Sequence, residues 1–244
     1  MIRQLRTVYT RNFTPPALVV TALHPVLQNP SKTPKNEGKP AMSQTLALTP
    51  DLDLTEPLRT ANDAGVALVE NALDVAFCEQ LAEEVSSGPF EAMPTEAGRA
   101  RQEGYIFRLR GHLENYPVVE QLGRDLVQQI HAQGGAVVGV SNWKPNEVDV
   151  QRYPVGALGI TPHLDFKRYR ILIAIITAAG SARFTLCKDR AGNPVNQWEV
   201  AAGDLMLLRA PGLGNHADGR PLHAVVGPRT GHRISVTWRM NSVV

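Results

Sequence analysis

The chain has 244 residues, of which 43 % are hydrophobic and 20 % charged, the composition of a soluble globular protein with one large domain. No uninterrupted apolar run reaches the roughly 18 residues that a membrane-spanning helix needs, which excludes a membrane-embedded protein. The two cysteines, Cys78 and Cys187, are too few for a disulfide framework and predict a reducing, cytoplasmic location.

The formal net charge of +2 is unevenly distributed along the chain. Residues 1–41 contain six basic residues and one acidic residue. Subtracting these from the totals of 25 and 23 leaves 19 basic and 22 acidic residues, a charge of −3 for the rest of the chain. A body of this sign lacks the overall electrostatic character of a duplex-binding protein, although it does not exclude a local basic patch.

Residues 1–48 are predicted to be an extension outside the globular domain. The stretch NPSKTPKNEGKPA is polar, rich in proline and without periodicity, which is typical of a disordered segment. Three origins stay open: a disordered tail, a targeting segment suggested by the basic N-terminus, or a non-native extension with Met42 as the true start. A single domain is expected over residues 49–244.

The first part of this domain has mainly helical patterns. Residues 65–73 (GVALVENAL) predict a short strand and a turn. Residues 74–85 have apolar side chains at helical spacing, with Asp74 as the N-cap. Residues 86–104 are rich in turn formers and predict a loop, and residues 116–135 predict a second helix that ends at a pair of glycines.

From residue 136 onward the pattern changes to short strands separated by turns. Eight strands are expected, at 148–153, 160–165, 171–178, 182–187, 197–201, 204–209, 222–226 and 232–240. Eight short strands after two helices predict an α+β fold: a double-stranded β-helix, or jelly roll, with N-terminal helices packed on one face. The helical part is expected over about 49–135 and the jelly-roll core over about 136–244.

A candidate metal site begins with the motif HLD. His163 and Asp165 are two residues apart at the end of a predicted strand, so their side chains point to the same face. His223 opens a later strand and supplies a second imidazole. Two histidines and one carboxylate on one side of an ion leave positions open, which is typical of non-haem Fe(II) oxygenases, whereas zinc sites are usually tetrahedral.

Other residues compete for these roles or have structural interpretations. His216 is the rival to His223, but it lies among Gly, Asn and Asp in a predicted loop. His232 is expected to point to the opposite face of its strand, and Asp204 to mark the entry to a strand. An isolated H-x-D pair also occurs often by chance, so the metal site depends on the distal histidine.

The last predicted strand has one polar and one apolar face. Arg233, Ser235, Thr237 and Arg239 alternate with large apolar residues. This polar face either faces water or lines the interior of the fold. Two guanidiniums in the interior would need anionic partners, because unpaired buried charges are costly. A dicarboxylate co-substrate would supply them, since arginine binds carboxylates through two parallel hydrogen bonds.

The order of these motifs resembles the Fe(II)/2-oxoglutarate-dependent dioxygenase superfamily. An H-x-D pair is followed by a histidine 60 residues on and by an Arg-x-Ser motif ten residues after that histidine. The resemblance implies that His163, Asp165 and His223 are the catalytic iron ligands. It also implies that Arg233, assisted by Ser235, binds the distal carboxylate of 2-oxoglutarate.

Within this superfamily, the closing segment RISVTWR is similar to the R-x5-R strand of the AlkB-type dealkylases, which implies that Arg239 also lies at the 2-oxoglutarate site. The segment QRYPVGALGITPHLD resembles that group's N-x-Y-x2-G…H-x-D motif, with Tyr153 as the tyrosine that hydrogen-bonds the co-substrate and Gly156 as the turn glycine. Gln151 replaces the group's asparagine, and the spacing from Tyr to His is one residue longer. The sequence has no convincing equivalent of the nucleotide-binding lid.

The resemblance implies an oxidoreductase that uses Fe(II), 2-oxoglutarate and dioxygen to hydroxylate a small or medium organic substrate, with release of succinate and CO2. An AlkB-like oxidative demethylase of nucleic acid or protein is the first alternative, and the mildly acidic body disfavours nucleic acid. A non-catalytic jelly-roll binding module is the second. Substrate specificity is expected in loops that cover the barrel mouth, at 86–116, 141–147 and 188–196.

Overall fold

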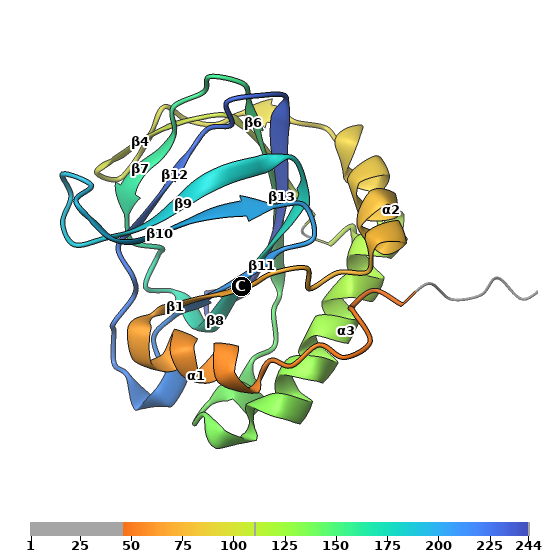
Figure 1. The fold of residues 1–244 in the computed structure, drawn as a ribbon, viewed down its shortest axis with the longest axis vertical. Helices are drawn as coiled ribbons and strands as arrows, with labels where there is room; N and C mark the ends of the chain where they lie inside the picture. The colour runs from red at the N-terminus through yellow and green to blue at the C-terminus, as the bar shows by residue number, and fades with distance from the viewer. Residues whose placement is uncertain (1–45, 110, 244) are drawn as a thin grey trace, which may run out of the picture. The chain divides into compact units, whose positions relative to one another are not determined.

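Two antiparallel β-sheets face each other in the computed structural model, which describes residues 46–109 and 111–243 (Figure 1). The predictions made for residues 1–45 lie outside the described residues. Three α-helices lie beside one of the sheets. The jelly-roll prediction is confirmed, because each of the eight strands expected after residue 136 is present, as β6 to β13.

The larger sheet has seven strands. In spatial order they are β1 (Val66–Val69), β11 (Leu205–Arg209), β8 (Tyr169–Ala179), β13 (His232–Asn241), β6 (Glu147–Pro154), β5 (Tyr105–Arg108) and β2 (Glu91–Ala92). The smaller sheet has six strands. They are β10 (Pro194–Ala201), β9 (Ser181–Cys187), β12 (His223–Val226), β7 (Gly159–His163), β4 (Ala100–Glu103) and β3 (Glu96–Ala97).

The helices cover the outer face of the larger sheet (Figure 1). They are α1 (Thr55–Ala64), α2 (Val75–Ser86) and α3 (Pro117–Gln133). Asp74 caps α2 as predicted, because its Oδ1 accepts a hydrogen bond from the backbone N–H of Phe77 at 3.1 Å. Helix α1 was not predicted: its sequence is polar, and Leu58 and Ala61 are its buried residues. The described residues also form four short 3-10 helices, at Leu113–Asn115, Gly134–Ala136, Val140–Asn142 and Leu213–Asn215.

Strand β13 links the helical layer to the space between the sheets. Its apolar side chains Ile234, Val236 and Trp238 are buried in the cluster that the helices form with the larger sheet. Helix α3 approaches closely here, since a Cβ on Gly123 would meet the Trp238 indole nitrogen at 2.8 Å. The alternate residues of β13 therefore point to the other face, between the two sheets.

Residues 86–104, predicted to be a loop, contain three short strands. Strand β2 extends the larger sheet, whereas β3 and β4 extend the smaller one beside β7. The segment therefore crosses from one sheet to the other and closes one side of the space between them. These strands are two to four residues long and show no clear apolar alternation. β2 and β4 pair with β5 and β7, whereas β3 pairs with the adjacent β4.

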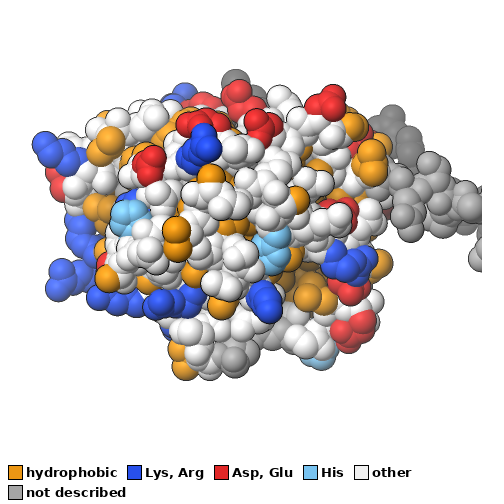
Figure 2. Space-filling view, turned by 90° about the horizontal axis from the view of Figure 1, so that it is seen from below, with side chains coloured by type: hydrophobic (Ala, Val, Ile, Leu, Met, Phe, Trp, Pro, Cys, Tyr) orange, Lys and Arg blue, Asp and Glu red, His pale blue; other side chains and the backbone are white. Residues whose placement is uncertain are grey.

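Within the described part of the chain, no helix is long and apolar enough to cross a membrane. Figure 2 shows one face of the molecule, on which acidic and basic side chains both occur and hydrophobic side chains are scattered among them. Basic side chains gather toward one edge of this face and acidic ones toward another. This face is therefore not a continuous basic surface of the kind that binds nucleic acid.

Candidate metal centre and the adjoining cavity

Strand pairing brings the two candidate histidine ligands together. His163 ends β7 and His223 begins β12, and the antiparallel register places these two residues opposite each other. Their ring centroids are 4.2 Å apart. Asp165 lies two residues beyond His163, just after the strand rather than within it as predicted, and its Oδ2 is 3.7 Å from His223 Nε2. One ligand atom from each residue can be chosen so that all three lie within 4.8 Å of one another.

The two imidazoles are oriented by the backbone. Nδ1 of His163 is 3.1 Å from the carbonyl oxygen of Thr161, and Nδ1 of His223 is 3.1 Å from that of Pro221. A carbonyl oxygen can only accept, so each Nδ1 carries a proton, and Nε2 is the ring nitrogen left to face a metal. Two such nitrogens and one carboxylate fit a divalent transition metal, and carbonyl-bound Nδ1–H groups are a usual feature of metal-ligating histidines.

The protonation states also suit a metal ligand set. Burial, together with the neighbouring His223, lowers the pKa of His163 to about 4, so the ring is neutral near pH 7. For Asp165, burial works to raise the pKa, but the charges of His223 and Arg239 outweigh it and hold the pKa below its usual range. A neutral imidazole beside an ionised carboxylate is the form that binds a cation.

An arginine joins the two segments that carry the ligands. Arg220 donates through Nη1 to the backbone carbonyl of Asp165, and through Nε and Nη2 to the two carboxylate oxygens of Asp218 at 2.7 and 3.0 Å. Lys167 Nζ lies 3.4 Å from the same carboxylate. Arg220 therefore fixes the loop after β7 against the loop before β12, in which Pro221 holds the ring of His223.

Arg233 is buried at one end of the cavity. It is 2 % exposed, and its Nη groups donate to the hydroxyls of Ser235 at 3.2 Å and Thr177 at 3.0 Å, while its Nε has no hydrogen-bond partner. Among the described residues no carboxylate forms an ion pair with it. Burial lowers the pKa of Arg233 to about 10, and the nearby Tyr153 offsets this only in part.

Arg239 has a different environment on the same strand. Its Nη1 donates to Asp149 Oδ2 at 2.7 Å and lies 4.0 Å from Glu147 Oε1. Its guanidinium also lies over the ring of Tyr169, 5.1 Å from the centroid. Burial acts to lower its pKa, but Asp149 and Asp165 raise it and the net shift is upward. Arg239 is thus a paired cation close to the candidate metal ligands.

Tyr153 occupies the position opposite Arg233 in the β6–β13 register. The side chain is buried, and its hydroxyl is 3.4 Å from Gln151 Oε1. Burial raises the pKa of Tyr153 despite the opposing charges of Arg233 and Arg239. The hydroxyl therefore stays protonated and can donate a hydrogen bond into the cavity.

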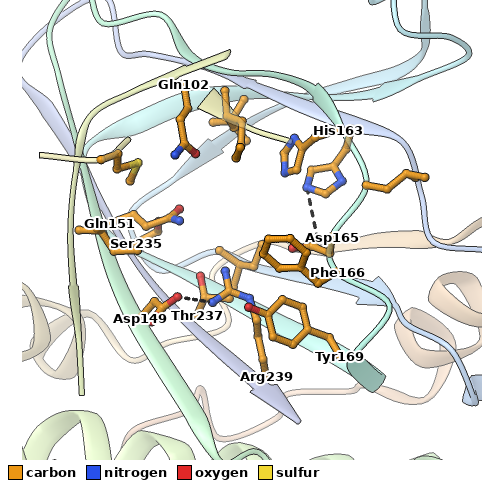
Figure 3. Close-up of a pocket in the computed structure, with 18 of the residues that line it drawn as sticks. Gln102, Asp149, Gln151, His163, Asp165, Phe166, Tyr169, Ser235, Thr237 and Arg239 are labelled. Atoms are coloured by element: carbon orange, nitrogen blue, oxygen red, sulfur yellow. Dashed lines mark hydrogen bonds and ion pairs between the residues drawn. The ribbon is translucent and has the colours of Figure 1, made fainter. Parts of the chain in front are cut away.

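A cavity of about 340 Å³ lies between the sheets and includes all seven candidate site residues in its lining. Figure 3 shows His163 and Asp165 on one side, Gln151, Ser235 and Asp149 on the other, and Arg239 near Asp165. Apolar side chains separate these polar groups, among them Met93, Ile106, Ile160, Leu164 and Phe166. This volume suits a small molecule or a single side chain.

The structure places the rival residues elsewhere. His216 lies beside Arg209, with Nε2 3.5 Å from Nη1 of that arginine, and is not part of the His/Asp cluster. Asp204 accepts hydrogen bonds from the backbone N–H groups of Asn71 and Ala201, which is the structural role expected at a strand entry. His232 is exposed.

The segments expected at the mouth contribute unequally. Residues 86–116 supply much of the wall through side chains between 93 and 108. From 141–147 only Glu147 lines the cavity, and nothing from 188–196 does, among the described residues. Asp149 and Glu147 were not predicted as site residues. An available signal was the period of two in EVDVQRY, in which Glu147, Asp149, Gln151 and Tyr153 share one strand face.

Comparisons with known proteins point to a fold rather than to a sequence family. No family model matches the chain, and no curated protein matches it in sequence. Among solved structures, a Pseudomonas putida prolyl-4-hydroxylase matches with a TM-score of 0.55 and 18 % identity over 77 % of this chain and 98 % of that one.

Two further structures cover similar parts of the chain. A Trichoplax adhaerens prolyl hydroxylase in complex with a hypoxia inducible factor peptide fragment has a TM-score of 0.54 at 15 % identity, over 77 % of this chain and 88 % of that one. A 2OG-Fe(II) oxygenase family oxidoreductase from Burkholderia pseudomallei has a TM-score of 0.58 at 12 % identity, over 79 % and 92 %. The fold implied by the sequence resemblance is therefore confirmed: this chain has the fold of the 2-oxoglutarate- and Fe(II)-dependent oxygenases.

Proposed function

We propose that this protein is an Fe(II)- and 2-oxoglutarate-dependent dioxygenase that hydroxylates a small or medium organic substrate with release of succinate and CO2. His163, Asp165 and His223 would hold the iron. When bound, Fe(II) and 2-oxoglutarate supply the activation of dioxygen that oxidises a C–H bond. The chain's own contribution is to bind these groups, orient them and exclude water from the space between the sheets.

The observation that carries this proposal is the uncompensated guanidinium of Arg233 in the same cavity as the His/Asp cluster. A buried cation without a carboxylate is costly, and its persistence indicates an anionic ligand. A dicarboxylate that ligates the metal at one end and reaches Arg233 at the other would satisfy both sites. Ser235 and Thr177 would hold the guanidinium in place, because both hydroxyls already accept its hydrogen bonds.

Arg239 and Tyr153 are assigned supporting roles in co-substrate binding. Arg239 lies near Asp165 and contributes positive charge beside the metal ligands. Tyr153 offers a protonated hydroxyl opposite Arg233. Neither residue is a candidate for proton transfer, since the tyrosine pKa is raised and the arginine is held charged by its carboxylate partners.

The direct test is succinate release. Protein loaded with Fe(II) and 2-oxoglutarate under anaerobic conditions should form succinate after the admission of air, and His163→Ala should not. A matched control is His216→Ala, which removes a histidine outside the cluster. If the wild-type protein binds Fe(II) but forms no succinate, the chain is a jelly-roll binding module and the proposal is wrong.

Oxidation of a protein or nucleic-acid group, including oxidative demethylation, is the second candidate. One structural neighbour, the prolyl hydroxylase from Trichoplax adhaerens, is in complex with a peptide fragment, which supports a protein side chain as the substrate. The spacing of Arg233 and Arg239 supports the likeness to AlkB-type enzymes. Tight, salt-dependent binding of methylated oligonucleotides would favour nucleic acid over both a peptide and a small molecule.

The proposal includes a cytoplasmic location. Cys78 and Cys187 are both buried free thiols. Burial raises the pKa of each thiol, so both are poor nucleophiles in the folded protein. Two unpaired thiols support a reducing compartment. Localisation of the tagged full-length chain by microscopy or cell fractionation would test this part of the proposal.

A further inference from the structure

Asp149 brings an unused hydrogen-bond acceptor into the cavity. The residue is 4 % exposed and lies on β6 opposite Thr237. Its Oδ2 accepts the hydrogen bond from Arg239, but its Oδ1 is buried and has no hydrogen-bond partner among the described residues. Nε of Arg108 is 3.8 Å from this oxygen, which is beyond hydrogen-bond distance. Buried acceptors are rarely left unsatisfied, so we expect a bound ligand to donate a hydrogen bond to this oxygen.

The buried cation beside Asp149, Arg239, also lies near Glu147. Glu147 and Asp149 are both buried, and within the described ranges Arg239 is the buried guanidinium that forms ion pairs with both. Arg239 donates to Oδ2 of Asp149, so Oδ1 has no buried cation within hydrogen-bond distance among the described residues. Arg108 is 53 % exposed, so its attraction for Asp149 is screened by water. A cationic donor would therefore be stabilised at this oxygen.

Glu147 differs from its neighbour in having its oxygens occupied. Its Oε1 accepts a hydrogen bond from the Tyr169 hydroxyl at 2.8 Å, and its Oε2 accepts one from Asn241 Nδ2 at 2.7 Å. Asp149 is thus the carboxylate of this pair with an oxygen available to a ligand. Figure 3 shows Asp149 across the cavity from His163 and Asp165, on the wall that faces the candidate metal centre.

The space between Asp149 and the metal ligands is partly apolar. Met93 comes from the segment between β2 and β3, Ile106 from β5, and Ile160 from β7. Leu164 and Phe166 come from the loop that carries Asp165. Phe166 is 52 % exposed, which places it at the mouth. A ligand that fits this space has a compact hydrocarbon part and a single donor group that reaches Asp149.

We propose that Asp149 Oδ1 is a substrate-recognition site and that it binds a protonated amine on an otherwise uncharged substrate. This inference rests on the proposed function, because the amine would hold a C–H bond of the same molecule toward the metal centre. It adds a substrate class, small aliphatic or aromatic amines, and a specificity-determining residue. The amine donates to Oδ1 while Oδ2 keeps its hydrogen bond with Arg239.

The test compares amines with their neutral counterparts. The probes are L-prolinamide, L-leucinamide and L-phenylalaninamide, each paired with its N-acetyl derivative, which has no ammonium group. Calorimetry with the full chain, Mn(II) and 2-oxoglutarate measures binding without turnover. The wild-type protein should bind at least one amide about tenfold or more tightly than its N-acetyl form, the size expected for a charged hydrogen bond.

Two variants with side chains of nearly unchanged size show which carboxylate is responsible for the preference for the amine. Asp149→Asn keeps an oxygen for Arg239 but loses the charge. The ratio of the affinity for the free amine to the affinity for its N-acetyl form should therefore fall to near one. Glu147→Gln removes a carboxylate from the same strand and the same arginine, and it should keep the wild-type ratio. If both variants lose the preference for the amine equally, the combined negative charge of the two carboxylates selects the amine, and not Asp149 itself. That result would overturn the assignment. Should Asp149→Asn not fold, the double variant Asp149→Leu/Arg239→Met removes the ion pair as a unit. Its preference is compared with that of the wild type in Mn(II) alone, because Arg239 is also assigned to co-substrate binding.

Succinate release separates this inference from the proposed function. Wild-type protein that forms succinate from 2-oxoglutarate but binds each amide no better than its N-acetyl form overturns the amine site and leaves the dioxygenase standing. Protein that forms no succinate overturns both. Amide binding that is selective, dependent on Asp149 and accompanied by an increased rate of succinate formation is the expected result.

Discussion

The two buried arginines of β13 occupy opposite environments although they share a strand and a face. Arg233 is 2 % exposed and Arg239 is 7 % exposed. Arg233 donates to two hydroxyls and has a pKa lowered to about 10, whereas Arg239 donates to Asp149 and has a raised pKa. One end of the cavity therefore carries an uncompensated positive charge, and the other carries a positive charge that the fold neutralises.

This difference distinguishes a charge that is paired within the fold, on Arg239, from a charge with no carboxylate partner among the described residues, on Arg233. The pairing of Arg239 with Asp149 is built into the register of β6 and β13, in which Glu147 lies directly opposite Arg239 and Asp149 lies diagonally across from it. No described carboxylate forms an ion pair with Arg233, so its charge must be offset by something that binds. On the proposed function, the same strand stabilises the protein at one end and binds an anion at the other.

The largest expected effect is the loss of turnover on removal of a metal ligand, which would affect both ends of the cavity at once. His163→Ala and Asp165→Ala should each abolish succinate formation, because two remaining ligands do not hold the iron in a facial arrangement. Both residues lie at the end of a strand or just after it, so the fold should survive, as measured by circular dichroism. Full activity in either variant would remove the metal assignment.

The next effect concerns stability at the paired end. Arg239→Met leaves Asp149 buried without its cation, and the free energy of unfolding should fall by about 3–5 kcal/mol. Urea unfolding of the unliganded protein measures this change. Arg233→Met is the matched control, and it should leave the unfolding free energy unchanged or raise it, because it removes a buried charge that lacks a partner. Equal destabilisation by the two substitutions would contradict the proposed difference.

Much of the fold follows from local sequence patterns. The alternation of polar and apolar residues in 232–240 predicted that β13 has one polar and one apolar face, and the structure has Ile234 and Val236 in the helical layer. The short strands at 91–103 were not predicted, and two of them, β2 and β4, pair with β5 and β7. Their conformation depends on residues distant in sequence, which a local pattern does not contain.

The site could be anticipated only where its residues form a motif. His163 and Asp165 share a face because they are two apart on an extended chain, and the distal His223 follows from its place at a strand start. For Asp149 the period of two in EVDVQRY was a signal for a shared strand face but not for its partner, and Thr177 had no signal of its own. Their contacts with the arginines depend on the registers of β6 and β8 against β13, which are set by the whole sheet.

At the uncompensated end, Arg233→Met should raise the apparent Michaelis constant for 2-oxoglutarate by about 30-fold or more, since loss of a buried, hydrogen-bonded charge partner costs about 2 kcal/mol at least. The Michaelis constant for the primary substrate should change much less. Steady-state succinate assays with either component varied separate the two effects. Similar increases in both constants would show that Arg233 supports the cavity in general and does not bind the co-substrate.

The smallest effect tests whether Ser235 orients that guanidinium. Ser235→Ala removes one of the two hydroxyls that accept hydrogen bonds from Arg233, and an intramolecular hydrogen bond typically contributes about 1 kcal/mol net. The Michaelis constant for 2-oxoglutarate should therefore rise by about fivefold. Thr237→Val is the control on the same strand face, because Thr237 lines the cavity but gives Arg233 no hydrogen bond. An equal increase in the Thr237 variant would mean that cavity polarity, rather than the position of Arg233, governs co-substrate binding.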